Sequence, residues 1–167
     1  MREEFDLLEQ PFAKRGKRME EMVEVMRTLW SGGVVEHHGE FYDFGPLEMR
    51  PAPTEPVPVY VGGHSALAFE RAARMGDGWL GMYYTMEELL EHCATLQQAR
   101  EDAGTADRPF EVIASPMMPP KPDLLAEIEA AGVTTILTSS WFTTGITAPE
   151  ISRAEEMIAV YGERFIH

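Results

Sequence analysis

The stretch that decides the fold is VPVYVGGHSALAFERAARMGDGWLGM, residues 57–82. Its first five residues form an apolar run with the length and β-branched composition of a buried strand. Gly62 and Gly63 end this run, and Ser65 is a residue type that commonly caps the start of a helix. A second apolar run, residues 79–82, follows the helical segment after a glycine-rich turn. The stretch therefore predicts a strand, a helix and a second strand in succession.

The same alternation continues to the end of the chain, which predicts a parallel sheet covered by helices. The predicted strands are residues 57–61, 79–82, 110–115 and 133–137, and the predicted helices are 66–75, 86–103, a segment capped by Asp123 and ended by Gly132, and 149–165. Two architectures fit four strand–helix units: an open doubly wound sheet, or part of an eight-unit barrel. A full barrel needs roughly 250 residues, which is more than the 167 of this chain.

The first 56 residues have a different pattern. Apolar residues at helical spacing predict a helix over residues 16–31. Residues 34–37 and 40–44 predict a hairpin with its turn at His38-Gly39. Five prolines within residues 46–58 predict an extended connector without regular structure. We therefore expect one domain, 1–167, in which residues 1–56 precede the four units of 57–167.

Charge and composition exclude several classes of protein. The chain has 28 acidic and 14 basic residues, so its formal net charge is −14, which argues against binding to nucleic acid or to an anionic membrane surface. No apolar run approaches the ~20 residues of a spanning helix. The charged start of the chain predicts no secretory signal, and its single cysteine, Cys93, excludes an internal disulfide framework and a cysteine-based zinc site. We expect a cytoplasmic protein.

Four runs of the sequence resemble, in order and spacing, segments of the luciferase-like oxidoreductases, the bacterial-luciferase-type enzymes that use reduced FMN or a deazaflavin coenzyme. The runs are Arg15-Gly16-Lys17-Arg18-Met19-Glu20-Glu21 continuing to Leu29-Trp30, Gly39-Glu40-Phe41-Tyr42-Asp43-Phe44, Pro51-Ala52-Pro53 with residues 56–65, and residues 71–79. The detailed match covers about residues 3–82. Beyond them, the likeness is the general alternation of strands and helices.

The resemblance implies a TIM barrel in which residues 57–61 correspond to the fifth strand. This chain would then hold four β/α units, a half barrel, together with an N-terminal helix and a β-hairpin. The function implied is a flavin- or deazaflavin-dependent oxidoreductase of monooxygenase type, with FMN or an F420-type deazaflavin as cofactor. The sequence does not choose between the two or identify a substrate. The catalytic histidine and carboxylate of some deazaflavin members lie in the other half of the barrel, so no catalytic residue is assigned here.

The candidate cofactor site lies between the end of the predicted strand, residues 57–61, and the start of the following helix. Gly62 and Gly63 let a phosphate approach the backbone, and free N–H groups at the helix start favour an anion. Ser65 adds a hydroxyl group, and the resemblance implies that this segment, including Ala66, contacts the phosphate end or ribityl chain of the cofactor. The alternative is an ordinary tight turn in which Ser65 is only an N-cap. His64 could contact a phosphate or a ring, but a solvated loop residue is the favoured interpretation.

Three later loops are expected to open on the same face as this turn, because the carboxyl ends of barrel strands share one face. They are residues 82–85, in which Tyr83 and Tyr84 are candidate pocket residues, 115–119 and 138–142. The alternative is that they are plain surface loops. No metal site is predicted, because His37-His38 and His92-Cys93 are adjacent pairs whose side chains diverge. Adjacent glutamates are typical of solvated helix faces, and the sequence has three such pairs, Glu20-Glu21, Glu87-Glu88 and Glu155-Glu156. Cys93 is predicted to be a buried, inert thiol.

A half barrel leaves two strand edges and one apolar sheet face without cover. We expect a homodimer, since symmetric pairing is common. A separate chain that supplies the missing half could cover the face equally well, and so could the N-terminal helix and hairpin by folding over it. The chain could also be part of a longer protein. The rival to the enzyme is a non-catalytic half barrel that binds flavin, a phosphate compound or a partner chain.

Overall fold

The computed structural model describes residues 2–117, 122–138 and 153–165. It divides into two compact units, Met1–Val59 and Tyr60–His167. The first unit contains α1 (Arg2–Leu7), α2 (Arg15–Trp30), β1 (Val34–His38) and β2 (Asp43–Glu48). The second contains β3 (Tyr60–Gly62), α3 (Ala66–Met75), β4 (Gly78–Tyr84), α4 (Met86–Asp102), β5 (Glu111–Pro116), α5 (Pro122–Ala130), β6 (Thr135–Ile136) and α7 (Ala154–Phe165).

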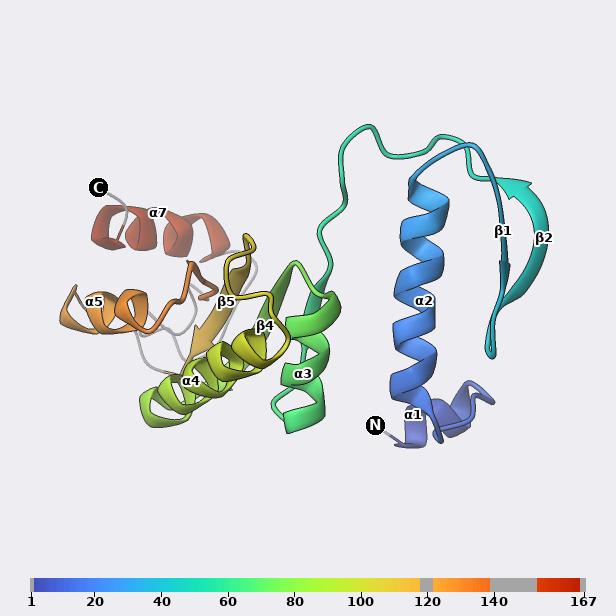
Figure 1. Ribbon diagram of the computed structural model, residues 1–167. Coiled ribbons are helices and arrows are strands. Elements are labelled where there is room, and N and C mark those ends of the chain that lie inside the picture. The colour runs from blue at the N-terminus through green and yellow to red at the C-terminus, as the bar shows by residue number, and fades with distance from the viewer. Residues whose placement is uncertain (1, 118–121, 139–152, 166–167) are drawn as a thin grey trace. The chain divides into compact units, whose positions relative to one another are not determined.

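In the first unit, α2 packs beside the antiparallel β1–β2 hairpin (Figure 1). Glu21 of α2 connects this helix to the hairpin. Its carboxylate accepts hydrogen bonds from the backbone N–H groups of Glu40, Phe41 and Tyr42 at 2.8–3.1 Å, and it lies 3.2 Å from Nε2 of His37. The Glu21 side chain is only 13% exposed, so the prediction that it belongs to a solvated helix face is wrong.

Two other expectations for this unit need correction. The predicted turn at His38-Gly39 lies too early, because β1 includes His38 and the loop comprises residues 39–42. The carboxylate oxygens of Glu21 accept the hydrogen bonds of this loop. These bonds join segments that are distant in sequence. Pro46, predicted within an irregular connector, lies in β2. A proline is tolerated there because each strand of a two-stranded sheet has a free edge.

Replacing Glu21 with glutamine is expected to loosen the hairpin. Burial raises the pKa of Glu21, but the N–H groups of Tyr42 and Phe41, the His37 ring and the N–H of Glu40 outweigh it, so the pKa lies below its usual range. A lowered folded-state pKa gives stability that is present above the usual pKa of about 4.3 and lost as the pH falls through the folded-state value. We expect a melting temperature lower by roughly 5 °C at pH 7 and a smaller difference below about pH 4.

The measurement is thermal unfolding with amide exchange of Phe41 and Tyr42, and the matched control is Glu24→Gln on the exposed face of α2. Equal melting temperatures for the two variants at pH 7 would contradict the role given to Glu21.

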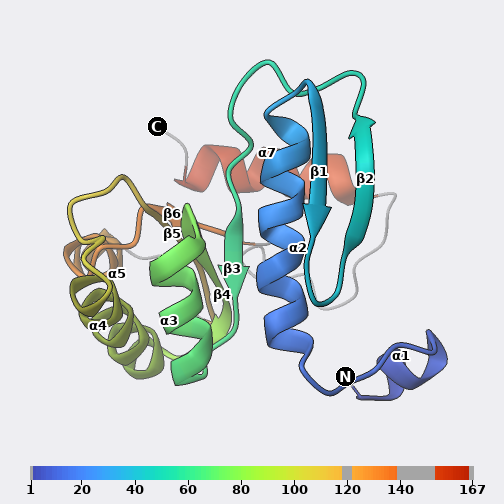
Figure 2. The ribbon, with the colours of Figure 1, turned by 45° about the vertical axis from the view of Figure 1, so that its right-hand side comes forward.

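The second unit is built on a parallel sheet of order β3-β4-β5-β6. The order never reverses among the described strands. Since parallel crossovers are right-handed, consecutive order places the connecting helices on one face, as in a barrel. A doubly wound sheet instead has a point where the order reverses. Figures 1 and 2 show α3 and α4 side by side on one face of this sheet. The fold therefore favours the barrel-type alternative, a four-unit α/β layer whose closure into a barrel is not shown.

The core lies between this sheet and its helices. Val61, Trp79 and Val112 are adjacent in register and buried, and α3 and α4 cover them with further buried residues: Ala68, Phe69, Ala72, Ala73, Leu89, Cys93 and Leu96. Side chains alternate along a strand, so the next row, Leu80 and Ile113, belongs to the opposite face, where both are only half-buried. This opposite face is the one for which the sequence predicts a partner.

Element types in the second unit agree with the predictions from sequence, and some boundaries differ. The helix α1 of the first unit was not predicted. The first strand of the sheet starts at Tyr60 and not at Val57, after Pro56 and Pro58. Asp123 does not cap α5, because the helix already begins at Pro122, a residue that suits the first helical position. The predicted residues 149–152 of the last helix lie outside the described residues. In the described part of the chain, no helix is both long and apolar enough to span a membrane.

Candidate functional site

The turn from β3 to α3 has the geometry of an exposed strand-to-helix connection. Gly62 is the last residue of β3, and Gly63 has a φ of +106°, a value that favours glycine. Ser65 is the N-cap of α3, and its Oγ accepts from the N–H of Ala68 at 3.3 Å. Ser65 is therefore confirmed as the N-cap of α3, a role that is common to both alternatives. Because its hydroxyl acts as the acceptor in this bond, the hydroxyl proton stays available for a second partner.

Two backbone donors of this turn remain available. Among the described residues, the N–H groups of Ala66 and Leu67 have no hydrogen-bond partner, as expected in the first turn of a helix. Gly62 has no crowded neighbour, because a Cβ added to it would meet nothing nearer than the carbonyl oxygen of Leu80 at 3.7 Å. An anionic oxygen can thus approach the backbone at Gly62 and meet two N–H groups and the helix dipole. This donor set fits a phosphate group.

Trp79 fixes this turn from beneath. Its indole Nε1 donates to the carbonyl oxygen of Gly63 at 2.8 Å, and its side chain is fully buried beside Phe69, with a ring-centroid distance of 5.6 Å. Gly81, two residues along the same strand, leaves room for the indole, since a Cβ there would lie 2.1 Å from the ring. The sequence predicted Trp79 as a core residue but gave no signal of its bond to the turn.

His64 belongs to an aromatic cluster at the carboxyl end of β3 and β4. Nδ1 of His64 lies 3.4 Å from the hydroxyl oxygen of Tyr84, and its ring stacks on that of His92 at a centroid distance of 6.0 Å. His92, from α4, also meets the Tyr84 ring edge-on at 4.6 Å. His64 was predicted to be a solvated loop residue, and it is exposed but has these ring partners. Sequence reasoning missed His92, because only the packing of α4 brings it to this edge.

Glu88 adds a negative charge to the same edge. It forms a capping box with Thr85, whose N–H donates to Glu88 Oε2 at 2.8 Å. The N–H and hydroxyl of Thr85 lower the pKa of Glu88, burial opposes them, and His92 and His64 lower it further. Glu88 is thus a helix cap, and it is exposed, as predicted for the Glu87-Glu88 pair. Burial is also the main cause of a raised pKa of Tyr84, so its hydroxyl stays protonated at neutral pH.

Tyr83 stands out in backbone geometry. Its φ is +62°, in a region that aromatic residues rarely occupy, and the β4–β5 register shifts between Met82 and Tyr84. This bulge leaves the Tyr83 side chain 60% exposed at the carboxyl end of the sheet. Strained residues at such positions are often held for function, so Tyr83 stays a candidate pocket residue beside the alternative of a plain surface loop.

Tyr83→Gly is expected to stabilise the folded chain by up to about 1 kcal/mol, because glycine removes the left-handed strain at little cost in buried surface. The matched control is Tyr84→Gly at the next position, which removes a half-buried ring and is expected to destabilise. Urea unfolding of both variants measures the difference. A Tyr83→Gly variant that is as unstable as Tyr84→Gly would show that the exposed ring, and not strain, dominates at this position.

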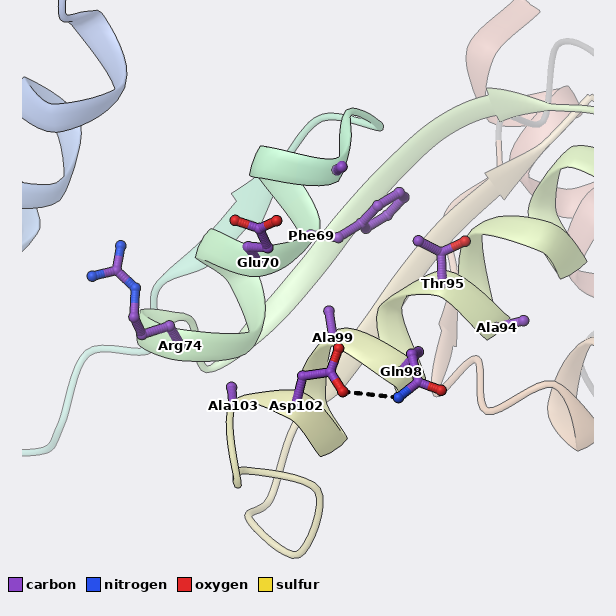
Figure 3. Close-up of a pocket in the computed structure, with 10 residues that line it drawn as sticks. Phe69, Glu70, Arg74, Ala94, Thr95, Gln98, Ala99, Asp102 and Ala103 are labelled. Carbon is purple, nitrogen blue, oxygen red and sulfur yellow. Dashed lines mark hydrogen bonds between the residues drawn. The ribbon is translucent and has the colours of Figure 1, made fainter.

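Other candidate sites carry less chemistry. A groove of about 650 Å³ lies between α3 and α4 and is lined by Phe69, Thr95 and Ala99. Gln98 also lines it and donates to Asp102 at 2.9 Å (Figure 3). The groove lies on the helical layer and not at the strand ends. Cys93 is buried, as predicted, and burial raises the pKa of its thiol. The described residues contain no cluster of three metal-ligating side chains. Loop residues 118, 119 and 139–142 lie outside the described residues.

Comparison with known proteins assigns the family. A family model described as luciferase-like monooxygenase matches residues 2–120, so the chain belongs to this family, as its sequence motifs predicted. An uncharacterized protein of Mycobacterium tuberculosis is 42% identical over 135 residues, covering 81% of this chain and 46% of the relative. The F420-dependent glucose-6-phosphate dehydrogenase of Gordonia bronchialis is 32% identical, covering 61% of this chain and 30% of that enzyme. The chain spans less than half the length of these relatives.

Solved structures support the same fold. The F420-dependent tetrahydromethanopterin reductase of Methanopyrus kandleri superposes with a TM-score of 0.57 and 18% identity, covering 66% of this chain and 37% of the reductase. A riboflavin lyase solved with modified FMN and riboflavin has a TM-score of 0.56 and 14% identity, covering 76% of this chain and 34% of the lyase. The luciferase-like neighbours are TIM barrels, which agrees with the consecutive parallel sheet described above.

Proposed function

We propose that this chain holds the phosphate-bearing part of a flavin or F420-type deazaflavin cofactor in a luciferase-like oxidoreductase. The observation that carries the proposal is the pair of unpartnered N–H groups, Ala66 and Leu67, in the same turn as the open backbone of Gly62. Family membership supports it, since relatives are named for F420 dependence and a similar structure contains modified FMN. Ser65 and Ala66 complete the proposed contact set.

The residues of this chain would bind and orient, and the cofactor would supply electron or hydride transfer when bound. The turn would hold the phosphate, Trp79 would fix the turn through Gly63, and Tyr83 would contribute an exposed ring at the same end of the sheet. We assign no proton donor or acceptor to this chain. A non-catalytic half barrel that only binds the cofactor is therefore the second candidate.

A second part of the proposal concerns assembly. The sheet face away from the helices is incompletely covered, with Tyr60 36% and Met82 37% exposed, and neither β3 nor β6 pairs on its outer edge with another described strand. A second copy of the chain, or a chain that supplies the remaining strands, would cover this face and both edges. We favour the second copy because symmetric association needs no further gene product.

The test is a titration of the purified chain with FMN and, separately, with the F420-type deazaflavin, with the mass measured by light scattering in the same sample. A dimer with micromolar affinity for either cofactor would support both parts of the proposal, and turnover with the reduced cofactor would then separate the enzyme from the non-catalytic alternative. A monomer that binds neither would contradict both. Gly63→Ala should weaken this binding, because alanine is strained at a φ of +106° and its Cβ would lie 3.0 Å from that of Ala68. Gly45→Ala, far from the turn in sequence and without steric conflict, is the matched control.

A further inference from the structure

Among the described residues, the candidate phosphate site lacks the side chains that usually neutralise phosphate. The segments that bring residues to this edge, 60–68, 82–92 and 115–117, contain no lysine or arginine, and the whole chain is strongly acidic. Within these segments, His64 and His92 are the only side chains that can carry a positive charge. Since histidine is the side chain that commonly changes charge between pH 5 and 8, the electrostatics of the edge depend on the protonation of these two rings.

The two rings are coupled to each other and to their neighbours. They stack at a centroid distance of 6.0 Å, so two positive charges on the pair would repel each other. Tyr84 of β4 lies 3.4 Å from Nδ1 of His64, and Glu88 of α4 interacts electrostatically with both rings. His64 is exposed and His92 is half-buried. The exposed ring of His64 is thus the one that can meet a ligand.

We propose that His64, paired with His92, is a proton-dependent ligand of the cofactor phosphate, so that this chain binds a phosphorylated cofactor more tightly in acid than in alkali. The inference rests on the proposed function and adds a regulation to the same site. When protonated, His64 supplies the charge that the backbone donors of Ala66 and Leu67 lack. When it loses the proton, only neutral donors remain, close to the negative charge of Glu88.

The direction in which affinity changes with pH distinguishes this proposal from phosphate binding by the backbone donors alone. A phosphate monoester such as that of FMN gains negative charge as the pH rises through about 6. Fixed backbone donors would therefore bind FMN equally or more tightly at higher pH. A protonated histidine predicts the reverse, because its charge disappears over the same range. Riboflavin, which lacks the phosphate, should show neither trend.

The experiment is equilibrium dialysis of the full chain with FMN, riboflavin and the F420-type deazaflavin between pH 5.5 and 8.5. We expect FMN affinity to fall on the order of tenfold across this range, the value of one charge-assisted hydrogen bond. His64→Gln should remove this fall, binding FMN on the order of tenfold more weakly at pH 5.5 and like the unmodified chain at pH 8.5. His38→Gln, an exposed histidine paired with Asp43, is the matched control and should keep the original profile.

Glu88→Gln tests the coupling, because glutamine can keep the capping box with Thr85 while it removes the charge. It should move the fall in affinity to lower pH, a change that a merely structural role would not produce. Circular dichroism at each pH verifies that the variants are folded. FMN binding that is independent of pH, tighter at high pH, or unchanged by His64→Gln overturns this inference and leaves the proposed function standing. Absence of binding to FMN and to the deazaflavin at every pH overturns both.

Discussion

Trp79→Ala is expected to lower the free energy of unfolding by about 3–5 kcal/mol, a large part of the stability of an ordinary domain. The side chain is fully buried and packs between Phe69 and Tyr84, with ring-centroid distances of 5.6 and 6.0 Å. Its removal leaves a cavity beneath the β3–α3 turn that the rigid sheet cannot close. Urea unfolding followed by far-ultraviolet circular dichroism measures the loss.

Trp79→Phe separates packing from the hydrogen bond. Phenylalanine keeps an aromatic ring in the core but cannot donate to the carbonyl oxygen of Gly63, which Nε1 of Trp79 reaches at 2.8 Å. We expect a loss of about 1–3 kcal/mol and faster amide exchange at Gly63 and His64. Trp30→Phe, a half-buried residue of the first unit, is the matched control and should leave the exchange of the turn unchanged. If it changes that exchange as much as Trp79→Phe does, the indole bond does not fix the turn.

The sequence predicted the local features of the second unit and missed the contacts between its elements. Periodicity and turn residues gave α3 and α4 nearly to the residue, because an N-cap such as Ser65 and an apolar stripe are local signals. The strand β3 was misplaced by three residues, since its start depends on pairing with Gly78 of β4. Pairing partners are distant in sequence, and an apolar run does not name them.

In the candidate site, too, the sequence predicted the local features and missed the contacts between elements. Gly62, Gly63 and Ser65 could be singled out because a strand followed by glycines and a capping residue is a local pattern. The bond from Trp79, the stacking of His92 on His64 and the strained backbone of Tyr83 arise only when β4 and α4 pack against that turn. Glu21 is a further contact that local patterns do not reveal, because its three backbone hydrogen-bond donors lie about twenty residues away along the chain.

Gly81→Ala is expected to destabilise the chain through Trp79 and not through the backbone of Gly81 itself. A Cβ at residue 81 would lie 2.1–2.8 Å from three atoms of the indole ring, and the buried ring has little space to retreat. Overpacking of this kind costs about 1–3 kcal/mol. Gly45→Ala, where a Cβ would meet nothing within 4 Å, is the control and should be nearly neutral.

The specific cause can be tested in the background of Trp79→Phe, whose smaller ring lacks the outer atoms that the new Cβ would strike. There, Gly81→Ala should cost much less than in the unmodified chain, so the double variant is more stable than the sum of the two single losses predicts. Urea unfolding of the four chains measures this coupling. Additive losses would mean that the alanine acts on the strand directly. Gly81 would then have no part in making room for the tryptophan that holds the β3–α3 turn.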